Sequence, residues 1–137
     1  MASPVAAAKK QLRSLVKQRL STLSQDAVQA QSRCIFDTLK NHPSYKNANR
    51  ISIYLSMPAA EVQTDAIVRD ALSAGKQVFV PYLYKSTLDI PDTPSRIMDM
   101  VQLKNIHDYE TLAKDKWNIP SIDSETVASR ERILGND

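Results

Sequence analysis

Two short apolar runs with a helical pattern between them constrain the fold of this chain more than any other feature. The first run, residues 51–55, is long enough for one buried strand and too short for a helix. Residues 64–74 then place apolar side chains at helical spacing and lead to Gly75, which suits the end of a helix. The second run, residues 77–81, ends at a proline, which we expect to stop the strand because proline cannot donate to a sheet. Strand, helix and strand in this order predict a βαβ unit with parallel strands.

Helical patterns precede this unit, and a further strand follows it. Residues 5–23 predict an amphipathic helix, and residues 24–40 predict a second helix. After a proline-containing loop at residues 85–95, residues 97–103 alternate weakly and predict a third strand. We therefore expect one α/β domain over residues 1–137, with a mostly parallel sheet, flanking helices and an N-terminal helical pair.

The predicted sheet is small for a parallel one. Parallel sheets need cover on both faces, and three strands make a narrow platform for it. The chain also stops at a turn-forming sequence, residues 135–137, where another strand would be expected to begin. These features predict a domain that is incomplete at its C-terminus.

Positive charge is concentrated near the N-terminus. The net charge of the chain is +3, but residues 1–50 carry nine Lys or Arg against two acids, which gives +7. Residues 51–100 and 101–137 give −2 each, from four basic against six acidic residues and from five against seven. A basic N-terminal segment suggests an anionic partner: phosphate, nucleic acid or a membrane surface. No aromatic residue interleaves with the charges before Phe36, so we expect no nucleic-acid partner.

The rare residue types exclude several kinds of site. Only two glycines occur, so no glycine-rich loop is available to wrap a nucleotide phosphate. Two histidines and one cysteine cannot assemble a zinc-type ligand set, so we predict no metal ligands. The single cysteine, Cys34, excludes an internal disulfide, and its helical context predicts a small buried side chain. No run approaches the roughly 18 apolar residues of a membrane span, so we expect a soluble protein with no membrane partner.

One carboxylate stands at a position where ligands commonly bind. Glu61 follows Met57-Pro58, the sequence that ends the first predicted strand, and precedes the next helix. In α/β folds, the loop at the carboxyl end of a strand is where small ligands bind. Glu61 is therefore a candidate binding residue, and a solvated loop charge is the alternative interpretation.

Five short motifs occur in order along the chain. They are KKQLR at residues 9–13, RISIYLSM at 50–57 followed by E-x-x-T at 61–64, VFVP at 78–81, MDMV at 98–101 and WNIP at 117–120. Together, over residues 8–134, they resemble 5-formyltetrahydrofolate cyclo-ligase, also called methenyltetrahydrofolate synthetase.

The resemblance implies an α/β fold and an enzyme of folate one-carbon metabolism that depends on ATP and Mg²⁺. ATP phosphorylates the formyl oxygen of 5-formyltetrahydrofolate, a ring nitrogen closes on the activated carbon, and phosphate leaves to give 5,10-methenyltetrahydrofolate. Such a step needs positioning and charge neutralisation more than a protein nucleophile, and we assign no catalytic residue.

The resemblance also implies site residues. Lys9, Lys10 and Arg13 fall on the family's ATP-phosphate-binding segment, and Lys10 and Arg13 are one helical turn apart on a polar face. The alternative is a solvated helix face.

The folate side falls on later residues. Leu55 and Glu61 match folate-binding positions, and a carboxylate suits the donor-rich edge of a pterin ring. Met98, Met100 and Trp117 are candidate walls of the folate pocket, because flat rings favour aromatic and thioether surfaces. Ordinary core packing is the alternative for these three side chains.

The chain departs from the family in one respect. Family members continue with a strand and a glycine-rich segment, G-R-G-x-G-Y-Y-D, that helps to hold ATP, substrate and Mg²⁺. We find no such segment here, so the chain corresponds to a truncated enzyme of roughly two thirds of the length. Two functions follow: the ATP-dependent cyclisation itself, or an inactive folate-binding fragment. We expect a monomer with a small-molecule substrate.

Residues 1–25 leave the cellular location open. They contain five Lys or Arg, no acid and several small residues, as mitochondrial targeting peptides do. Cleavage of such a peptide would remove Lys9, Lys10 and Arg13, so a cytoplasmic protein with a basic first helix is favoured.

Overall fold

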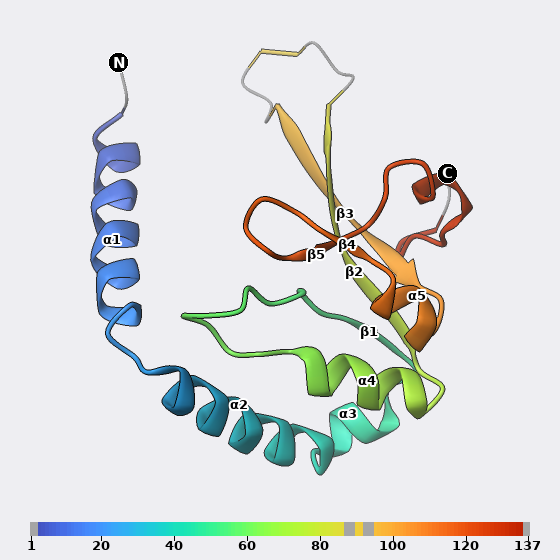
Figure 1. Cartoon of the computed structure of the whole chain (residues 1–137). Coiled ribbons are helices and arrows are strands. Elements are labelled where there is room, and N and C mark those ends of the chain that lie inside the picture. Colours follow the sequence, from blue (N-terminus) through green and yellow to red (C-terminus); the bar gives the residue numbers. More distant parts are fainter. Residues whose placement is uncertain (1–2, 87–89, 92–94, 136–137) are drawn as a thin grey trace.

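The computed structural model describes residues 3–86, 90–91 and 95–135 (Figure 1). Its elements, in chain order, are α1 (Pro4–Leu20), α2 (Gln25–Lys40), α3 (Pro43–Asn47), β1 (Arg50–Ser52), α4 (Asp65–Ser73), β2 (Gln77–Lys85), β3 (Arg96–Leu103), α5 (Ile106–Glu110), β4 (Ala113–Lys114), β5 (Pro120–Ser121) and the 3₁₀-helix η1 (Val127–Ser129). The predicted α/β class and the N-terminal helical pair are confirmed. In the described part of the chain, no helix is long and apolar enough to cross a membrane.

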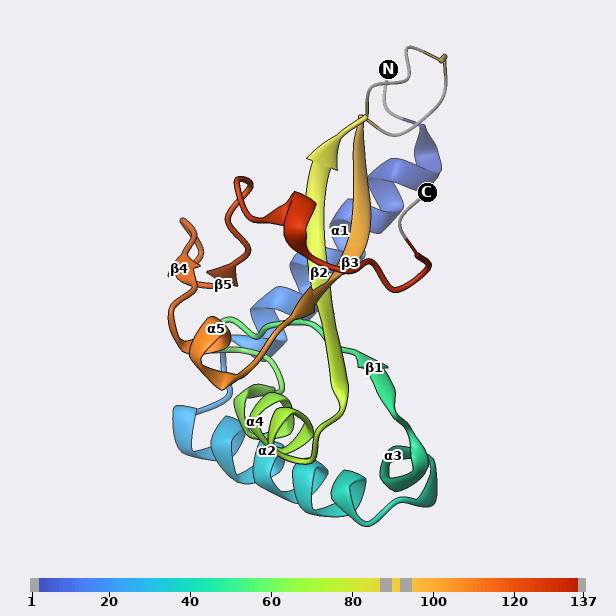
Figure 2. The ribbon, with the colours of Figure 1, turned by 90° about the vertical axis from the view of Figure 1, so that its right-hand side faces the viewer.

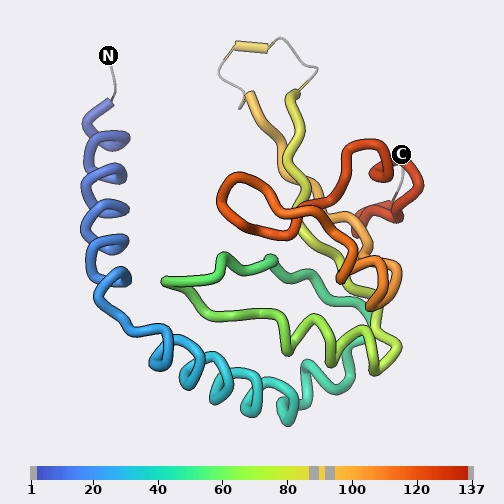
Figure 3. The backbone as a smooth tube through the Cα atoms, viewed as in Figure 1, coloured from blue at the N-terminus to red at the C-terminus, as the bar shows by residue number. Residues whose placement is uncertain are grey.

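The N-terminal helices begin at side-chain caps. The hydroxyl oxygens of Ser3 and Ser24 accept hydrogen bonds from the third backbone N–H beyond each, at 3.1 Å in both helices. Helix α2 lies under the domain and buries Val28 and Ser32, whereas no residue of α1 is buried. The backbone path in Figure 3 shows α1 rising on one side, away from the strands. Cys34 of α2 is exposed, so its predicted burial is wrong.

The main sheet has the order β1-β2-β3 and is mixed rather than mostly parallel. Strands β1 and β2 are parallel and flank α4, which confirms the predicted βαβ unit. Strands β2 and β3 are antiparallel over the whole length of β3. The prediction of a mostly parallel sheet is therefore wrong. The antiparallel pairing follows from the short connection between the two strands. Residues 86–95 link β2 directly to β3, whereas a parallel neighbour needs a longer crossover.

Pro81 does not end β2, contrary to the prediction, because the strand continues to Lys85. Phe79 directs its backbone carbonyl toward β1, where it accepts a hydrogen bond from Ile53 at 2.9 Å. Two residues later Pro81 faces the same side, but β1 has ended at Ser52. The missing N–H of the proline therefore removes no ladder bond.

The core lies between the sheet and the helices α4 and α5. Its fully buried members come from facing elements: Val68 and Ala71 of α4, Val78 and Val80 of β2, and Val101 and Leu103 of β3. Leu55, three residues beyond β1, also joins this core. The residues that leave β1 are thus anchored at the edge of the core.

The opposite face of the sheet is covered by Arg50 and the end of the chain. The Arg50 guanidinium lies 4.8 Å from the centre of the buried Phe79 ring. It donates hydrogen bonds to the Glu131 carboxylate at 3.2 Å and to the Ile133 carbonyl at 3.1 Å. Residues 131–133 run along the outer edge of β3, as Figure 2 shows for the red segment.

Candidate functional site

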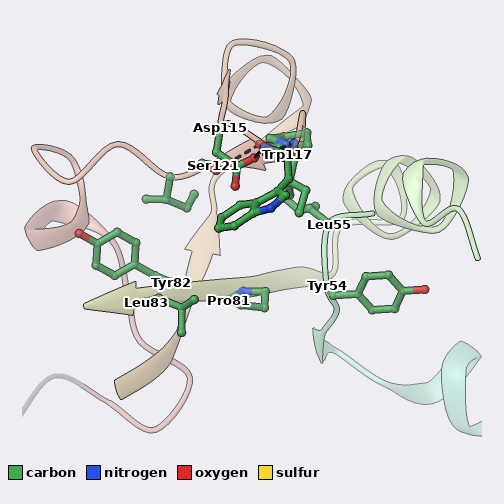
Figure 4. Close-up of a pocket in the computed structure, with 11 residues that line it drawn as sticks. Tyr54, Leu55, Pro81, Tyr82, Leu83, Asp115, Trp117 and Ser121 are labelled. Carbon is green, nitrogen blue, oxygen red and sulfur yellow. Dashed lines mark hydrogen bonds between the residues drawn. The ribbon is translucent and has the colours of Figure 1, made fainter. Parts of the chain in front are cut away.

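A cavity of about 350 Å³ lies where the chain leaves the carboxyl end of β1. Three segments line it: Tyr54 and Leu55 after β1, residues 81–83 of β2, and a loop that contributes Asp115, Trp117 and residues 119–122. Figure 4 shows these side chains around the opening. The carboxyl end of a parallel strand is the usual place for a ligand in α/β folds. The cavity is therefore the candidate functional site.

Trp117 is held at the cavity by a tight turn between β4 and β5. The Asp115 carboxylate accepts hydrogen bonds from the backbone N–H groups of Trp117 at 2.8 Å and Ile119 at 3.0 Å. Asn118 takes a positive φ of 63° at the turn, a conformation that asparagine tolerates. The Trp117 side chain projects from this hairpin toward β2 (Figure 4) and stays 57% exposed. The Lys116 ammonium lies 4.3 Å from the centre of the Trp117 ring, so the turn leaves the other part of this aromatic side chain exposed.

Glu61 lies in a loop that is tied together by its own side chains. Its Oε1 accepts a hydrogen bond from the Met57 backbone N–H at 2.5 Å. The Gln63 side-chain amide donates to the carbonyls of Met57 at 2.8 Å and Glu61 at 3.0 Å. The backbone N–H of Gln63 donates to Ser32 of α2 at 2.8 Å, which anchors the loop on that helix. Ala60 has a φ of 66°, so the loop holds a strained residue directly before Glu61.

Glu61 is not among the residues that line the cavity, and its one link to the lining is an electrostatic effect on Tyr54. Tyr54, a lining residue, donates its hydroxyl proton to the Val62 carbonyl at 2.8 Å, next to Glu61 in the chain. Burial raises the pKa of the Tyr54 hydroxyl, and the negative charge of Glu61 raises this pKa further. Glu61 therefore acts electrostatically on one wall of the cavity.

The structure brings only part of the predicted site together. Leu55 and Trp117 line one cavity, whereas Glu61 is not among the lining residues, and its role in folate binding stays a prediction. Met98 and Met100 lie on β3 outside the cavity; Met98 is 60% exposed and Met100 is half-buried. A role for the two methionines in folate binding stays a prediction.

Lys9, Lys10 and Arg13 lie on α1, which contributes no residue to the cavity lining and stands apart from the strands in Figure 1. All three side chains are exposed. Among the described residues, no salt bridge joins any of them to a carboxylate. Their charges are thus available to an anionic ligand, and the ATP-binding role stays a prediction.

Sequence reasoning missed three polar residues of the site. Tyr54, Asp115 and Ser121 line the cavity, and none was singled out as a binding residue. A signal for Asp115 is present in the sequence, because Asp115 and Asn118 are both residues that favour turns. An aspartate side chain in a turn commonly accepts a hydrogen bond from the backbone two residues later, which is an Asx turn. Tyr54 lies within the motif at residues 50–57, directly before Leu55, whereas no comparable signal marks Ser121.

No metal centre is built within the part of the chain that the structure describes. No three His, Cys, Asp or Glu side chains come close enough there to hold an ion together.

Fold and site together define the chain as an α/β protein with a ligand-sized cavity at the carboxyl end of a parallel strand pair. Comparison with known families then identifies the class: residues 5–133 match the 5-formyltetrahydrofolate cyclo-ligase family, and the chain belongs to this family. The resemblance inferred from the five motifs is confirmed.

Individual relatives agree with this membership. The chain is 38% identical over 116 residues to the 5-formyltetrahydrofolate cyclo-ligase of Mus musculus, which covers 84% of this chain and 52% of the relative. It is 30% identical over 117 residues to a probable 5-formyltetrahydrofolate cyclo-ligase of Caenorhabditis elegans, which covers 85% and 52%. The chain thus spans about half the length of these relatives.

Proposed function

We propose that this chain catalyses the ATP- and Mg²⁺-dependent cyclisation of 5-formyltetrahydrofolate to 5,10-methenyltetrahydrofolate, with the cavity as its folate site. One observation carries the proposal: two residues predicted to bind folate, Leu55 and Trp117, come from distant segments and line the same cavity. Family membership supports the substrate class, since relatives bear the name 5-formyltetrahydrofolate cyclo-ligase.

The cavity suits a flat ring system. Leu55 and Pro81 supply apolar walls, and the exposed indole of Trp117 offers a face on which a ring can stack. Ser121 and Asp115 add a hydroxyl group and a carboxylate to the lining. Such a mixture of apolar walls and a few polar groups is typical of small-molecule sites.

Glu61 supplies a negative charge for the donor-rich edge of the pterin. One of its oxygens is engaged with the Met57 N–H, which fixes the carboxylate in place. Within the described residues, no hydrogen bond engages the second oxygen, so it remains as an acceptor for a ligand. In this proposal the loop orients Glu61 and the substrate completes its hydrogen bonds.

The basic face of α1 serves the nucleotide. Lys9 and Lys10 lie one helical turn before Arg13, so the three charges can contact neighbouring phosphate oxygens. ATP, as the second substrate, supplies the phosphoryl group that makes the formyl oxygen a leaving group. The three cations would neutralise the charge that develops during this transfer. We assign no residue of this chain to Mg²⁺.

The second candidate function is folate binding without turnover. It is favoured by the position of Lys10 and its neighbours, which lie apart from the cavity (Figure 1). The two functions differ in whether bound folate is converted when MgATP is added.

A fluorescence titration followed by an absorbance assay tests both functions. Trp117 is the only tryptophan, so its emission reports directly on the cavity. We expect 5-formyltetrahydrofolate to change this emission with saturation. MgATP should then produce 5,10-methenyltetrahydrofolate, and Lys10→Ala and Glu61→Ala should abolish the product. Saturable binding without product would establish the second function, and no binding would overturn both.

A further inference from the structure

The hairpin of β4 and β5 carries two polar side chains that line the cavity. Asp115 directly follows β4, and Ser121 belongs to β5. A hydrogen bond from the Asp115 N–H to the Ile119 carbonyl, at 2.9 Å, closes the turn between them, and both side chains are half-buried. Figure 4 shows them with Trp117 on one side of the opening, across from residues 81–83 of β2. Asp115 and Ser121 therefore reach a ligand in the cavity from the same wall.

Asp115 uses one carboxylate oxygen for the turn and keeps the other for the cavity. Its Oδ1 accepts both turn hydrogen bonds, from the N–H groups of Trp117 at 2.8 Å and Ile119 at 3.0 Å. Among the described residues, no hydrogen bond or salt bridge engages its Oδ2. The neighbouring Lys116 ammonium lies over the Trp117 ring. Since an ionised carboxylate only accepts hydrogen bonds, Oδ2 is an acceptor that the protein leaves to a ligand.

Ser121 also presents an acceptor. Its hydroxyl donates its proton to the Ile119 carbonyl at 3.1 Å. A hydroxyl has one proton and two lone pairs, so the Ser121 Oγ has only acceptor capacity left. The hairpin wall of the cavity therefore consists of two acceptor oxygens, which a ligand N–H group satisfies. A ligand atom with a lone pair would instead be repelled there.

The substrate of the proposed function carries N–H donors on two edges of its pterin ring. One edge holds the 2-amino group and N3–H, which Glu61 serves in the proposed function. The other edge holds N8–H, a donor that exists only in the reduced ring, because N8 of the fully oxidised ring carries a lone pair in its place. Glu61 acts on the wall formed by Tyr54, whereas Asp115 belongs to the hairpin wall. The two carboxylates can therefore serve different edges of one ring.

We propose that Asp115 and Ser121 make the cavity specific for a reduced pterin ring by accepting the hydrogen bond of its N8–H. The inference rests on the proposed function, since it takes the cavity as the folate site. An oxidised ring would place the N8 lone pair against two acceptor oxygens and leave them unpaired, which lowers its affinity. The turn fixes the carboxylate before a ligand arrives, so this selection needs no rearrangement of the hairpin.

Calorimetric titration with 5-formyltetrahydrofolate and folic acid tests the inference. Folic acid has the oxidised ring and no N8–H, so we expect the unmodified chain to bind it at least tenfold more weakly. In Asp115→Asn, the amide oxygen stays on the turn, where two N–H groups require it, and the NH₂ group faces the cavity. This variant should reduce the preference for the reduced ring by roughly tenfold. Ser121→Ala removes one acceptor without touching the turn and should also reduce the preference.

Asp123→Asn is the matched control. Asp123 also accepts a backbone hydrogen bond in a turn, from the Glu125 N–H at 3.0 Å, but it does not line the cavity. Its substitution removes the same charge and should leave the preference unchanged. Thermal melts of all variants report on folding. If Asp115→Asn fails to fold, Ser121→Ala still tests the acceptor wall.

Three results would overturn the inference and leave the proposed function standing. They are no preference of the unmodified chain for the reduced ring, an unchanged preference in Ser121→Ala, and equal weakening of both ligands in Asp115→Asn. The last result would show that Asp115 acts only by holding the turn. No binding of 5-formyltetrahydrofolate by the unmodified chain would overturn the proposed function and this inference together.

Discussion

Leu55 and Trp117 line the same cavity (Figure 4), but Leu55 is buried and Trp117 is exposed. Leu55 is 8% exposed and belongs to the core, whereas Trp117 is 57% exposed on a hairpin. One residue therefore couples the candidate site to the stability of the domain, and the other does not. Substitutions at the two positions should separate binding from folding.

The first prediction compares these two residues. Trp117→Ala should lower the affinity for 5-formyltetrahydrofolate by roughly tenfold, since stacking contributes about 0.5–1.5 kcal/mol beyond buried area. Its melting temperature should stay unchanged. Leu55→Ala should destabilise the fold by about 2–5 kcal/mol. Calorimetric titration and thermal melts measure both effects, with Trp117→Phe as the control that keeps an aromatic face. An equal loss of stability in both alanine variants would contradict this division.

The second prediction concerns the two roles of Glu61. Glu61→Gln keeps an oxygen acceptor for the Met57 N–H and removes the charge, so we expect near-normal stability and weaker folate binding. Glu61→Ala removes both, and should also destabilise the loop by about 1–2 kcal/mol. Denaturant unfolding and fluorescence titration distinguish these outcomes. Normal affinity in Glu61→Gln would show that the charge has no part in binding.

The βαβ unit could be predicted because its signals are local. Two apolar runs and one helical pattern between them specify β1, α4 and β2 without distant information. The predicted, mostly parallel sheet was wrong in the orientation of β3. This orientation depends on the length of the connection at residues 86–95 and on the pairing with β2. Pro81 is tolerated inside β2 because it faces the side on which β1 has already ended, which is likewise a matter of strand pairing.

The candidate site was predictable where the family motifs mark it. Leu55 and Trp117 fall within two of the motifs, and the structure brings them to one cavity. Tyr54 lies in the same motif as Leu55 but was not singled out, and Ser121 lies outside the motifs and reaches the cavity only through tertiary packing. The separation of α1 from the cavity is likewise a tertiary feature. The sequence pattern of α1 predicts a helix but does not say where in the fold that helix lies. Incompleteness at the C-terminus stays a prediction.

The third prediction tests the strained residue before Glu61. Ala60 holds a φ of 66°, a region that costs an L-residue about 1–2 kcal/mol and glycine little. Ala60→Gly should therefore stabilise the fold, or at least not destabilise it. Ala59→Gly, at an exposed neighbour without positive φ, should destabilise it by a few tenths of a kcal/mol through the unfolded state. Urea unfolding measures the free energy of unfolding of both variants. An equal decrease in both would show that Ala60 is not strained.

The fourth prediction is a pH dependence that arises far from the cavity. Arg130, with a side chain only 4% exposed, donates to both Asp108 carboxylate oxygens, at 2.6 Å and 2.8 Å. Hydrogen bonding by Arg130 lowers the pKa of Asp108, and a hydrogen bond from the Lys104 backbone N–H adds to this, against the opposing effect of burial. Because the folded-state pKa lies below the unfolded value of about 3.9, the stabilisation is complete above that pH. It is lost as the pH falls through the folded-state pKa.

The free energy of unfolding should therefore decrease from about pH 5 to pH 2 more steeply in the unmodified chain than in Asp108→Asn. Asp108→Asn should also be destabilised at pH 7, by about 3–5 kcal/mol, because it leaves the buried Arg130 charge without its counter-ion. Asp123→Asn, an exposed substitution of the same kind, controls for a general loss of negative charge. Denaturant unfolding at pH 7, 5 and 3 measures the slopes. Parallel slopes for the unmodified chain and Asp108→Asn would show that the ion pair does not set the acid stability of the domain.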